Sequence, residues 1–229
     1  MTEAPLTRKQ LALTALVRLT VGLLLLLAIL LLPAGTATYW QAWVYATIVF
    51  APMTAFLAYL LLNNPRLLER RLRSKETDKQ QGLIVRFGTV SFLITLLLSG
   101  VDHRFGWSAV PVAVVLAADV VVLLGYAIFV LVLRENDHAS RVVEVEHGQH
   151  VVDTGPYAIV RHPMYTGVIA MTLATPVALG SWWALLPALP MVAVMTARIR
   201  NEERLLTEHL AGYAQYALKT KFRLIPRLW

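Results

Sequence analysis

Hydrophobic positions in this chain fall into long uninterrupted runs. Residues 19–65 contain no Asp, Glu, Lys or Arg. At about 1.5 Å per residue this run is too long for one helix across a hydrocarbon core of ~30 Å, which about 20 residues cross. Pro33, Gly35 and the threonines near them mark a turn inside the run. The pattern therefore predicts two membrane-spanning helices, at about 11–32 and 40–62.

Two more apolar runs follow a polar stretch. They predict a third helix at about 83–101 and a fourth at about 108–133, and Asp119 lies inside the fourth. A carboxylate in an apolar membrane helix is costly unless it is paired or functional. We therefore expect Asp119 to pair with Arg86, Arg104 or another polar group of the bundle.

The last uncharged run, residues 163–197, contains a turn near its middle. One straight helix through it would be on the order of 50 Å long, well beyond the thickness of the hydrocarbon core. Gly180-Ser181 lies near the midpoint, with prolines on either side. We predict a helical hairpin with arms at about 164–179 and 182–197. Each arm is slightly short for a full span, so we expect a tilted, kinked or incompletely inserted hairpin.

The composition agrees with this pattern. Of 229 residues, 57% are hydrophobic and 15% are charged, which is more apolar surface than a soluble domain of this length can bury. The prediction is an all-α integral membrane protein with about six hydrophobic helices in one structural domain. The chain has no cysteine, which excludes disulfides, thiolate metal sites and a catalytic cysteine. It also lacks a strand-framed G-x-G-x-x-G motif, so no Rossmann domain is expected.

Basic residues gather on one side of the predicted membrane. Seven Lys or Arg lie in residues 63–86 and seven in residues 198–229, whereas the predicted outer turns hold only Arg104. By the positive-inside rule both termini and the 134–162 segment face the cytoplasm, and we expect the membrane to be a bacterial inner membrane. The net charge of +7 is thus assigned to orientation in the bilayer, and no nucleic-acid partner is expected.

Polar residues concentrate between Arg134 and Tyr165, just before and at the start of the hairpin. Val and Glu alternate at 142–146, which favours a short extended piece, and Thr154–Pro156 marks a tight turn. Pro163 suits the first turn of a helix, whose free N–H groups can bind a carboxylate or another anion. The alternative is an ordinary cytoplasmic loop with interfacial tyrosines.

A second polar cluster follows the hairpin, at 197–216. Arg198 and Glu202 are four residues apart and share a helix face. Because both ends of a hairpin return to the same membrane face, we expect this pair to contact the 149–165 segment. The alternative is an amphipathic interfacial helix with solvated charges and one apolar stripe, formed by Leu206, Leu210, Tyr213 and Ala217.

The histidines do not predict a metal site. His138, His147 and His150 are irregularly spaced in a polar segment, where histidines are common. No metal is therefore expected.

The order of these motifs resembles a known family. "TGPYAIVRHPMYTG" is followed about thirty residues later by "RIRNEERLL" and then by "YAQY". The combination, which covers roughly the last 90 residues, is similar to the isoprenylcysteine carboxyl methyltransferases and the related phospholipid methyltransferases. The resemblance implies a helical membrane methyltransferase that uses S-adenosylmethionine and releases S-adenosylhomocysteine. Residues 1–133 would be N-terminal transmembrane helices, and residues 134–229 the cofactor-binding catalytic region.

The same resemblance implies roles for individual residues. The substrate-side arginine falls on Arg198, and Arg198 and His162 are the catalytic candidates. Near Val142 the chain lacks a glutamine that eukaryotic members use to contact the cofactor. The implied cofactor contacts lie before the hairpin, at its start and after its end, on Gln149, His150, Val151, Val152, Tyr157, His162, Pro163, Met164, Tyr165 and Glu202.

The expected acceptor is lipophilic and enters from the bilayer, with the carboxylate of a prenylcysteine-like molecule as the leading candidate. A carboxylate is ionised near pH 7 and needs no base, and Arg198 can hold it by a forked hydrogen bond. A phospholipid or other lipid amine would have to lose a proton, with His162 or Glu202 as the base. Further alternatives are an NADPH-dependent enzyme like the sterol reductases, some of which resemble this family in their membrane region, and a transporter or scaffold that binds no cofactor.

Overall fold

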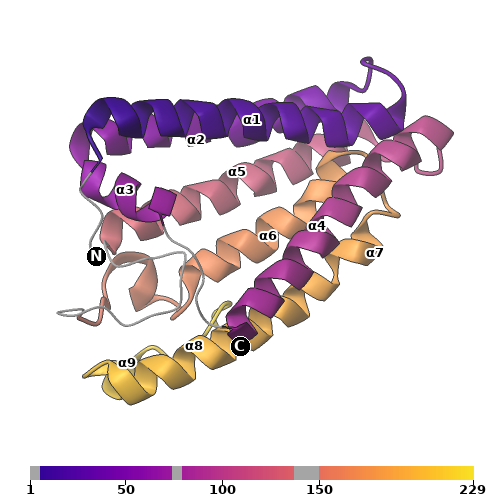
Figure 1. Ribbon diagram of the computed structural model, residues 1–229. Coiled ribbons are helices and arrows are strands. Elements are labelled where there is room, and N and C mark those ends of the chain that lie inside the picture. Colours follow the sequence, from indigo (N-terminus) through magenta and orange to yellow (C-terminus); the bar gives the residue numbers. More distant parts are fainter. Residues whose placement is uncertain (1–5, 74–78, 137–149) are drawn as a thin grey trace.

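Four helices of the computed structural model are long and apolar enough to cross a membrane. The structure describes residues 6–73, 79–136 and 150–229, and within these residues every regular element is helical (Figure 1). The predicted all-α membrane fold is therefore confirmed. The four long helices are α1 (Arg8–Ala34), α2 (Trp40–Asn63), α4 (Lys79–Phe105) and α5 (Val112–Glu135).

Local sequence explains most helix ends. α1 ends at Gly35, whose φ of 67° is left-handed and whose N–H donates to the carbonyls of the last turn. α5 begins at Val112, four residues later than predicted. Pro111 is the reason, because a proline ring disfavours helical backbone at the residue before it. The stretch 63–86, which the sequence presented as a basic loop, contains a further short helix, α3 (Pro65–Arg73).

The hairpin is present, but its second arm differs from the prediction. Its first arm is α6 (Pro163–Ala178), and a single turn, α7 (Leu185–Ala188), precedes the second arm, α8 (Pro190–His209). The predicted start at 182 was wrong because the proline ring removes a backbone donor, and Pro190 instead occupies the first turn of α8. The predicted end at 197 was also wrong, since the first charged residues mark the end of the apolar run and not the end of the helix.

The tip of the hairpin reaches the far end of the bundle. Tyr39, at the start of α2, donates from its hydroxyl to the carbonyl of Leu179 at 2.5 Å. Asp102, near the end of α4, accepts hydrogen bonds from the Ser181 hydroxyl and from the backbone N–H of Ser108, the latter at 2.8 Å. The hairpin therefore runs the full length of the bundle (Figure 1).

Two glycines bring the first arm of the hairpin against α5. A Cβ atom on Gly125 would lie 2.8 Å from the carbonyl oxygen of Gly167, and a Cβ on Gly167 would lie 2.7 Å from that of Gly125. The backbones of α5 and α6 are thus in direct contact. This close crossing determines where the start of α6 lies relative to the end of α5.

Asp119 does not have the partner that the sequence predicted. It is buried in α5 at 4% exposure, and neither carboxylate oxygen has a hydrogen-bond partner among the described residues. Arg86 and Arg104 both belong to α4. That helix packs mainly against α1, α7 and α8, and both arginines are exposed whereas Asp119 is buried.

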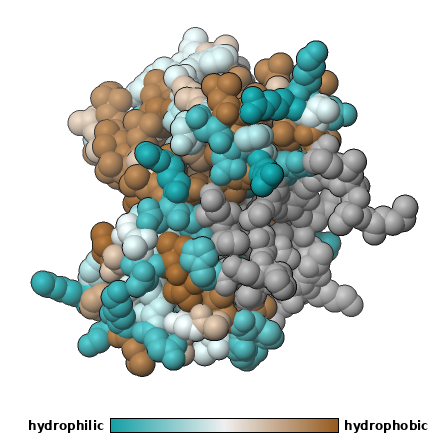
Figure 2. All heavy atoms as spheres, turned by 90° about the vertical axis from the view of Figure 1, so that its left-hand side faces the viewer, coloured by the Kyte–Doolittle hydropathy of each residue, from teal (hydrophilic) through white to brown (hydrophobic). Residues whose placement is uncertain are grey.

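The polar segments meet at one end of the bundle. The N-terminus of α1, the short helix α3, the end of α5 and the start of α6 all lie at the left of Figure 1. Figure 2 looks onto this end and shows hydrophilic side chains spread over it among hydrophobic ones. The arrangement places the predicted site region at a single end, which we expect to be the cytoplasmic one.

The glycine crossing gives a first prediction. Gly125→Ala forces a methyl group into the α6 backbone, and overpacking of this kind costs about 1–3 kcal/mol. We expect the thermal midpoint in detergent to fall clearly below that of the unchanged protein. Gly82→Ala in α4 is the matched control, because a Cβ there meets no atom within 4 Å. Equal midpoints for the two variants would contradict the prediction.

Candidate active site

The two ends of the hairpin meet through one tyrosine. Tyr165, in the first turn of α6, donates its hydroxyl hydrogen to Glu202 Oε2 at 2.7 Å. The same hydroxyl accepts a hydrogen bond from Arg198 Nε at 3.0 Å. Arg198 and Glu202 both lie on α8, one turn apart, so the contact that the sequence predicted across the hairpin is present. Arg198 is only 7% exposed and Glu202 is partly buried, and the phenol of Tyr165 bridges the two charged side chains.

The start of α6 leaves backbone donors without helical partners. Pro163 is the first helical residue, as predicted, and His162 is the N-cap residue but makes no side-chain capping bond. The N–H groups of Met164 and Tyr165 lie in the first turn, where no preceding carbonyl is available to them. Because these donors point out of the positive end of the helix, the position suits an anionic group such as a carboxylate.

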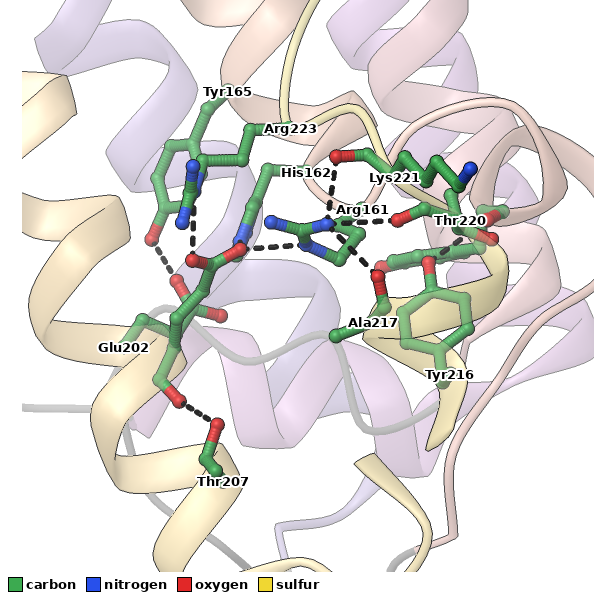
Figure 3. Close-up of polar contacts among 12 residues, drawn as sticks. Arg161, His162, Tyr165, Glu202, Thr207, Tyr216, Ala217, Thr220, Lys221 and Arg223 are labelled. Carbon is green, nitrogen blue, oxygen red and sulfur yellow. Dashed lines mark hydrogen bonds and ion pairs between the residues drawn. The ribbon is translucent and has the colours of Figure 1, made fainter. Parts of the chain in front are cut away.

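Glu203, the neighbour of Glu202, is the centre of a second and larger cluster. Its carboxylate accepts hydrogen bonds from Arg161 Nε and Arg223 Nε, each at 2.7 Å, and lies 3.2 Å from His162 Nε2. Figure 3 shows the side chains of Arg161, His162 and Arg223 close together at this cluster. Burial raises the pKa of Glu203, but the hydrogen bonds from His162, Arg161 and Arg223 outweigh it and lower the pKa to about 2.

The segment before the hairpin supplies a further wall. Tyr157 lies in a short 3-10 helix, η1 (Gly155–Ala158), where its hydroxyl accepts from Asn136 Nδ2 at 3.2 Å. Burial raises the pKa of Tyr157 to about 12; the hydrogen bond from Asn136 lowers it and the charge of Glu202 raises it. The Tyr157 ring also packs with Met164 against the same apolar cluster. Tyr157 and Met164 thus join the segment before the hairpin and the start of α6 to one apolar cluster.

The other predicted cofactor residues are less closely placed. His150 is exposed, Val152 is partly buried, and Val151 packs against a cluster of Leu210, Tyr213 and Tyr216. Gln149 lies outside the described residues, as do His138, His147 and the Val/Glu stretch at 142–146. In the described ranges, no group of three histidine or carboxylate side chains is arranged to hold a metal.

The predicted continuous stripe from Leu206 to Ala217 is interrupted. α8 ends at His209, and Gly212, with a φ of 85°, turns the chain before α9 (Tyr213–Lys219) begins. The turn lets the Tyr216 hydroxyl donate to the carbonyl of Tyr157 at 2.8 Å. The alternative of one uninterrupted amphipathic helix is therefore wrong, because the backbone is extended at Leu210 and left-handed at Gly212, and neither conformation continues a helix.

Sequence reasoning missed the Glu203 cluster. Two signals were visible in the chain: Arg161 stands directly before His162, and Glu203 is the second residue of an adjacent carboxylate pair. Neighbouring residues on a helix point about 100° apart, so two adjacent carboxylates cannot serve the same contact. Arg223, the remaining member of the cluster, gave no signal because it lies in a stretch without periodicity.

The low pKa of Glu203 gives a second prediction. A carboxylate whose pKa falls from 4.5 to about 2 on folding stabilises the folded state above pH 4.5. That contribution, on the order of 3 kcal/mol, is lost as the pH falls toward 2. We expect Glu203→Gln to have a lower thermal midpoint than the unchanged protein at pH 7, and the gap to narrow at pH 3. A gap that stays constant with pH would count against the ionised cluster.

Comparison with known proteins places this site in a methyltransferase context. Residues 112–212 match the model of a family described as phospholipid methyltransferase. A search of curated proteins gives no significant match. The matched range includes α5, α6 and the contact of Tyr165 with Arg198 and Glu202. The family belongs to the same group of membrane methyltransferases as the isoprenylcysteine carboxyl methyltransferases. Over the residues that build most of the candidate site, the chain is therefore similar to membrane-bound methyltransferases, and the match indicates methyl transfer as its chemistry.

Proposed function

We propose that this protein is an S-adenosylmethionine-dependent methyltransferase that methylates the carboxylate of a lipophilic, prenylcysteine-like acceptor. The observation that carries the proposal is the contact of Tyr165 with Glu202 and Arg198. It puts an acidic group, a basic group and a helix start together at one end of an apolar bundle. The acceptor reaches this point from the bilayer, and the cofactor reaches it from the cytoplasm of a bacterial cell.

The residues around Tyr165 fit such a cofactor. The N–H donors at the start of α6 match its carboxylate, and Glu202 can accept from its ammonium group or ribose hydroxyls. Tyr157, Met164 and the ring of Tyr165 offer apolar and aromatic surface for an adenine. His150, Val151 and Val152 are proposed to form the remaining wall with Gln149.

One orphaned polar atom supports the same fit. The hydroxyl of Tyr213 is buried and has no hydrogen-bond partner among the described residues. Burial raises the pKa of Tyr213, and the charges of Glu203 and Glu202 raise it further while the charge of Arg161 lowers it. A buried hydroxyl without a partner is costly, and a ligand with polar groups would remove that cost.

The chain's own residues would then position the acceptor. The bound cofactor supplies an activated methyl group, and in-line displacement requires correct placement of the reacting atoms more than acid–base chemistry. Arg198 binds one oxygen of the acceptor carboxylate and orients the other. The buried surroundings of Arg198 strengthen this hydrogen bond and exclude water. A carboxylate acceptor needs no base because it is already ionised at neutral pH.

The family match favours a second candidate, methylation of a phospholipid amine. An amine must lose a proton before or during transfer, and the candidates for the base are His162 and Glu202. His162 Nε2 lies 3.2 Å from Glu203, and Glu202 accepts from Tyr165. The proximity of Arg198 is a reason to rank the carboxylate first, since a cation repels an ammonium acceptor.

Cofactor binding is the first test. Calorimetric titration with S-adenosylhomocysteine is expected to show binding, and NADPH none. Glu202→Gln and Tyr165→Phe should each weaken that binding about tenfold, the effect of losing one charge-assisted hydrogen bond. Glu208→Gln is the matched control, because Glu208 is exposed on the same helix. Unchanged affinity in both site variants, or no heat with the unchanged protein, would reject the proposal.

Acceptor specificity is the second test. Transfer of a tritiated methyl group should proceed to prenylcysteine analogues, and Arg198→Gln should raise the acceptor KM about 10- to 100-fold while leaving S-adenosylhomocysteine affinity unchanged. Arg200→Gln, an exposed neighbour, serves as the control. Methylation of phosphatidylethanolamine instead of the carboxylate would overturn the first candidate in favour of the second.

A further inference from the structure

The C-terminal tail, residues 220–229, pairs with the segment that leads into α6. The backbone N–H groups of Arg161 and His162 donate to the carbonyls of Phe222 and Arg223, both at 2.9 Å. The hydroxyl of Thr166 donates to the tail carbonyl of Leu224, also at 2.9 Å. These bonds hold a segment that has no regular structure of its own. The tail lies beyond residue 212, where the family match ends.

The Arg161 side chain joins the tail to α8. One of its terminal nitrogens, Nη1, donates to the carbonyl oxygens of Thr220 and Lys221 at 2.8 and 2.9 Å. Its Nε donates to Glu203 at 2.7 Å, and the residue is 8% exposed. A buried guanidinium is costly unless its donors are satisfied, and here tail carbonyls and one helix carboxylate satisfy them.

Arg223 completes the cluster from the side of the tail. Its Nε donates to the second oxygen of Glu203 at 2.7 Å, and its guanidinium lies 5.3 Å from the centre of the Trp229 ring. The backbone N–H of Arg223 donates to the carbonyl of Trp229 at 2.9 Å, so the tail folds back on itself. Figure 3 shows Arg223 and Arg161 approaching from different segments.

This cluster contacts the residues that lead into α6. His162 is the N-cap residue, and its side chain contacts Glu203 instead of capping the helix. The direction of the first turn, including Tyr165, therefore depends on the tail and on Glu203. We propose that Glu203 and Arg223 are positioning residues that hold the start of α6, and with it Tyr165, in the geometry that binds the cofactor. The inference rests on the proposed function, because it assigns these residues an effect on that site.

The test compares Arg223→Gln and Arg223→Lys in the full-length protein in lipid nanodiscs. Amide hydrogen exchange reads the segment directly, since Pro163 has no amide hydrogen and a short peptide ending there reports on Arg161 and His162. In Arg223→Gln we expect exchange at these amides to rise about tenfold, the change that ~1.4 kcal/mol of lost stabilisation produces. The amides of α1 and α5 should keep their protection. Arg223→Lys retains the positive charge, so the amides of Arg161 and His162 should exchange more slowly in this variant than in Arg223→Gln.

Binding gives the second measurement. Arg223→Gln should weaken S-adenosylhomocysteine binding about tenfold and leave the acceptor KM unchanged, while Arg227→Gln, an exposed residue of the same tail, behaves as the unchanged protein. Glu203→Gln combined with Arg223→Gln should cost less than the sum of the two single changes, because they share one interaction. Normal exchange and normal binding in Arg223→Gln overturn the inference. So does loss of protection throughout the bundle, which would show a general loss of folding.

Failure of the proposed function gives a different result. If the unchanged protein does not bind S-adenosylhomocysteine, the proposed function and the effect on cofactor binding are both rejected. The exchange measurement then still decides whether the tail holds the start of α6.

Discussion

The carboxylate of Glu203 is the interaction on which the polar end of this protein depends. It accepts hydrogen bonds from Arg161, which precedes the hairpin, and from Arg223, which lies beyond it in the C-terminal tail. A single ionised group thus joins α8, the entry to α6 and the C-terminal tail. Two nearby cations stabilise its charge, and it in turn satisfies donors that would otherwise be buried without partners.

The apolar part of the fold makes that arrangement possible. The direct contact of Gly125 with Gly167 fixes α6 against α5, and Asp102 holds the tip of the hairpin at the far end of the bundle. With the crossing and the tip both held, the two open ends of the hairpin meet at one level. Tyr165 at the start of α6 then reaches Glu202 and Arg198 on α8. A helix pair in lipid has little hydrophobic drive to associate, so close backbone packing and a few polar contacts carry this task.

The two adjacent carboxylates divide the work at this site. Glu202 faces Tyr165 in the proposed cofactor pocket, and Glu203 faces the arginines that support it. Arg198 adds a buried positive charge beside the same tyrosine. That charge bears on which acceptor is methylated, since it attracts a carboxylate and repels an ammonium group. The chemistry proposed for the site therefore follows from which way three neighbouring side chains of α8 point.

Much of the molecule was predictable from the sequence alone. Uncharged runs longer than a bilayer determined the membrane helices and the hairpin, because no other structure satisfies the backbone in lipid. The spacing of Arg198 and Glu202, together with the hairpin, predicted their contact with the 149–165 segment. The tertiary structure alone decided the rest. It decided the start of α8 at Pro190 and the burial of Asp119 without a hydrogen-bond partner among the described residues. It also decided the grouping of Arg161, His162 and Arg223 around Glu203. Periodicity records which face of a helix is apolar, but contacts between segments far apart in the chain leave no period and depend on how those segments pack.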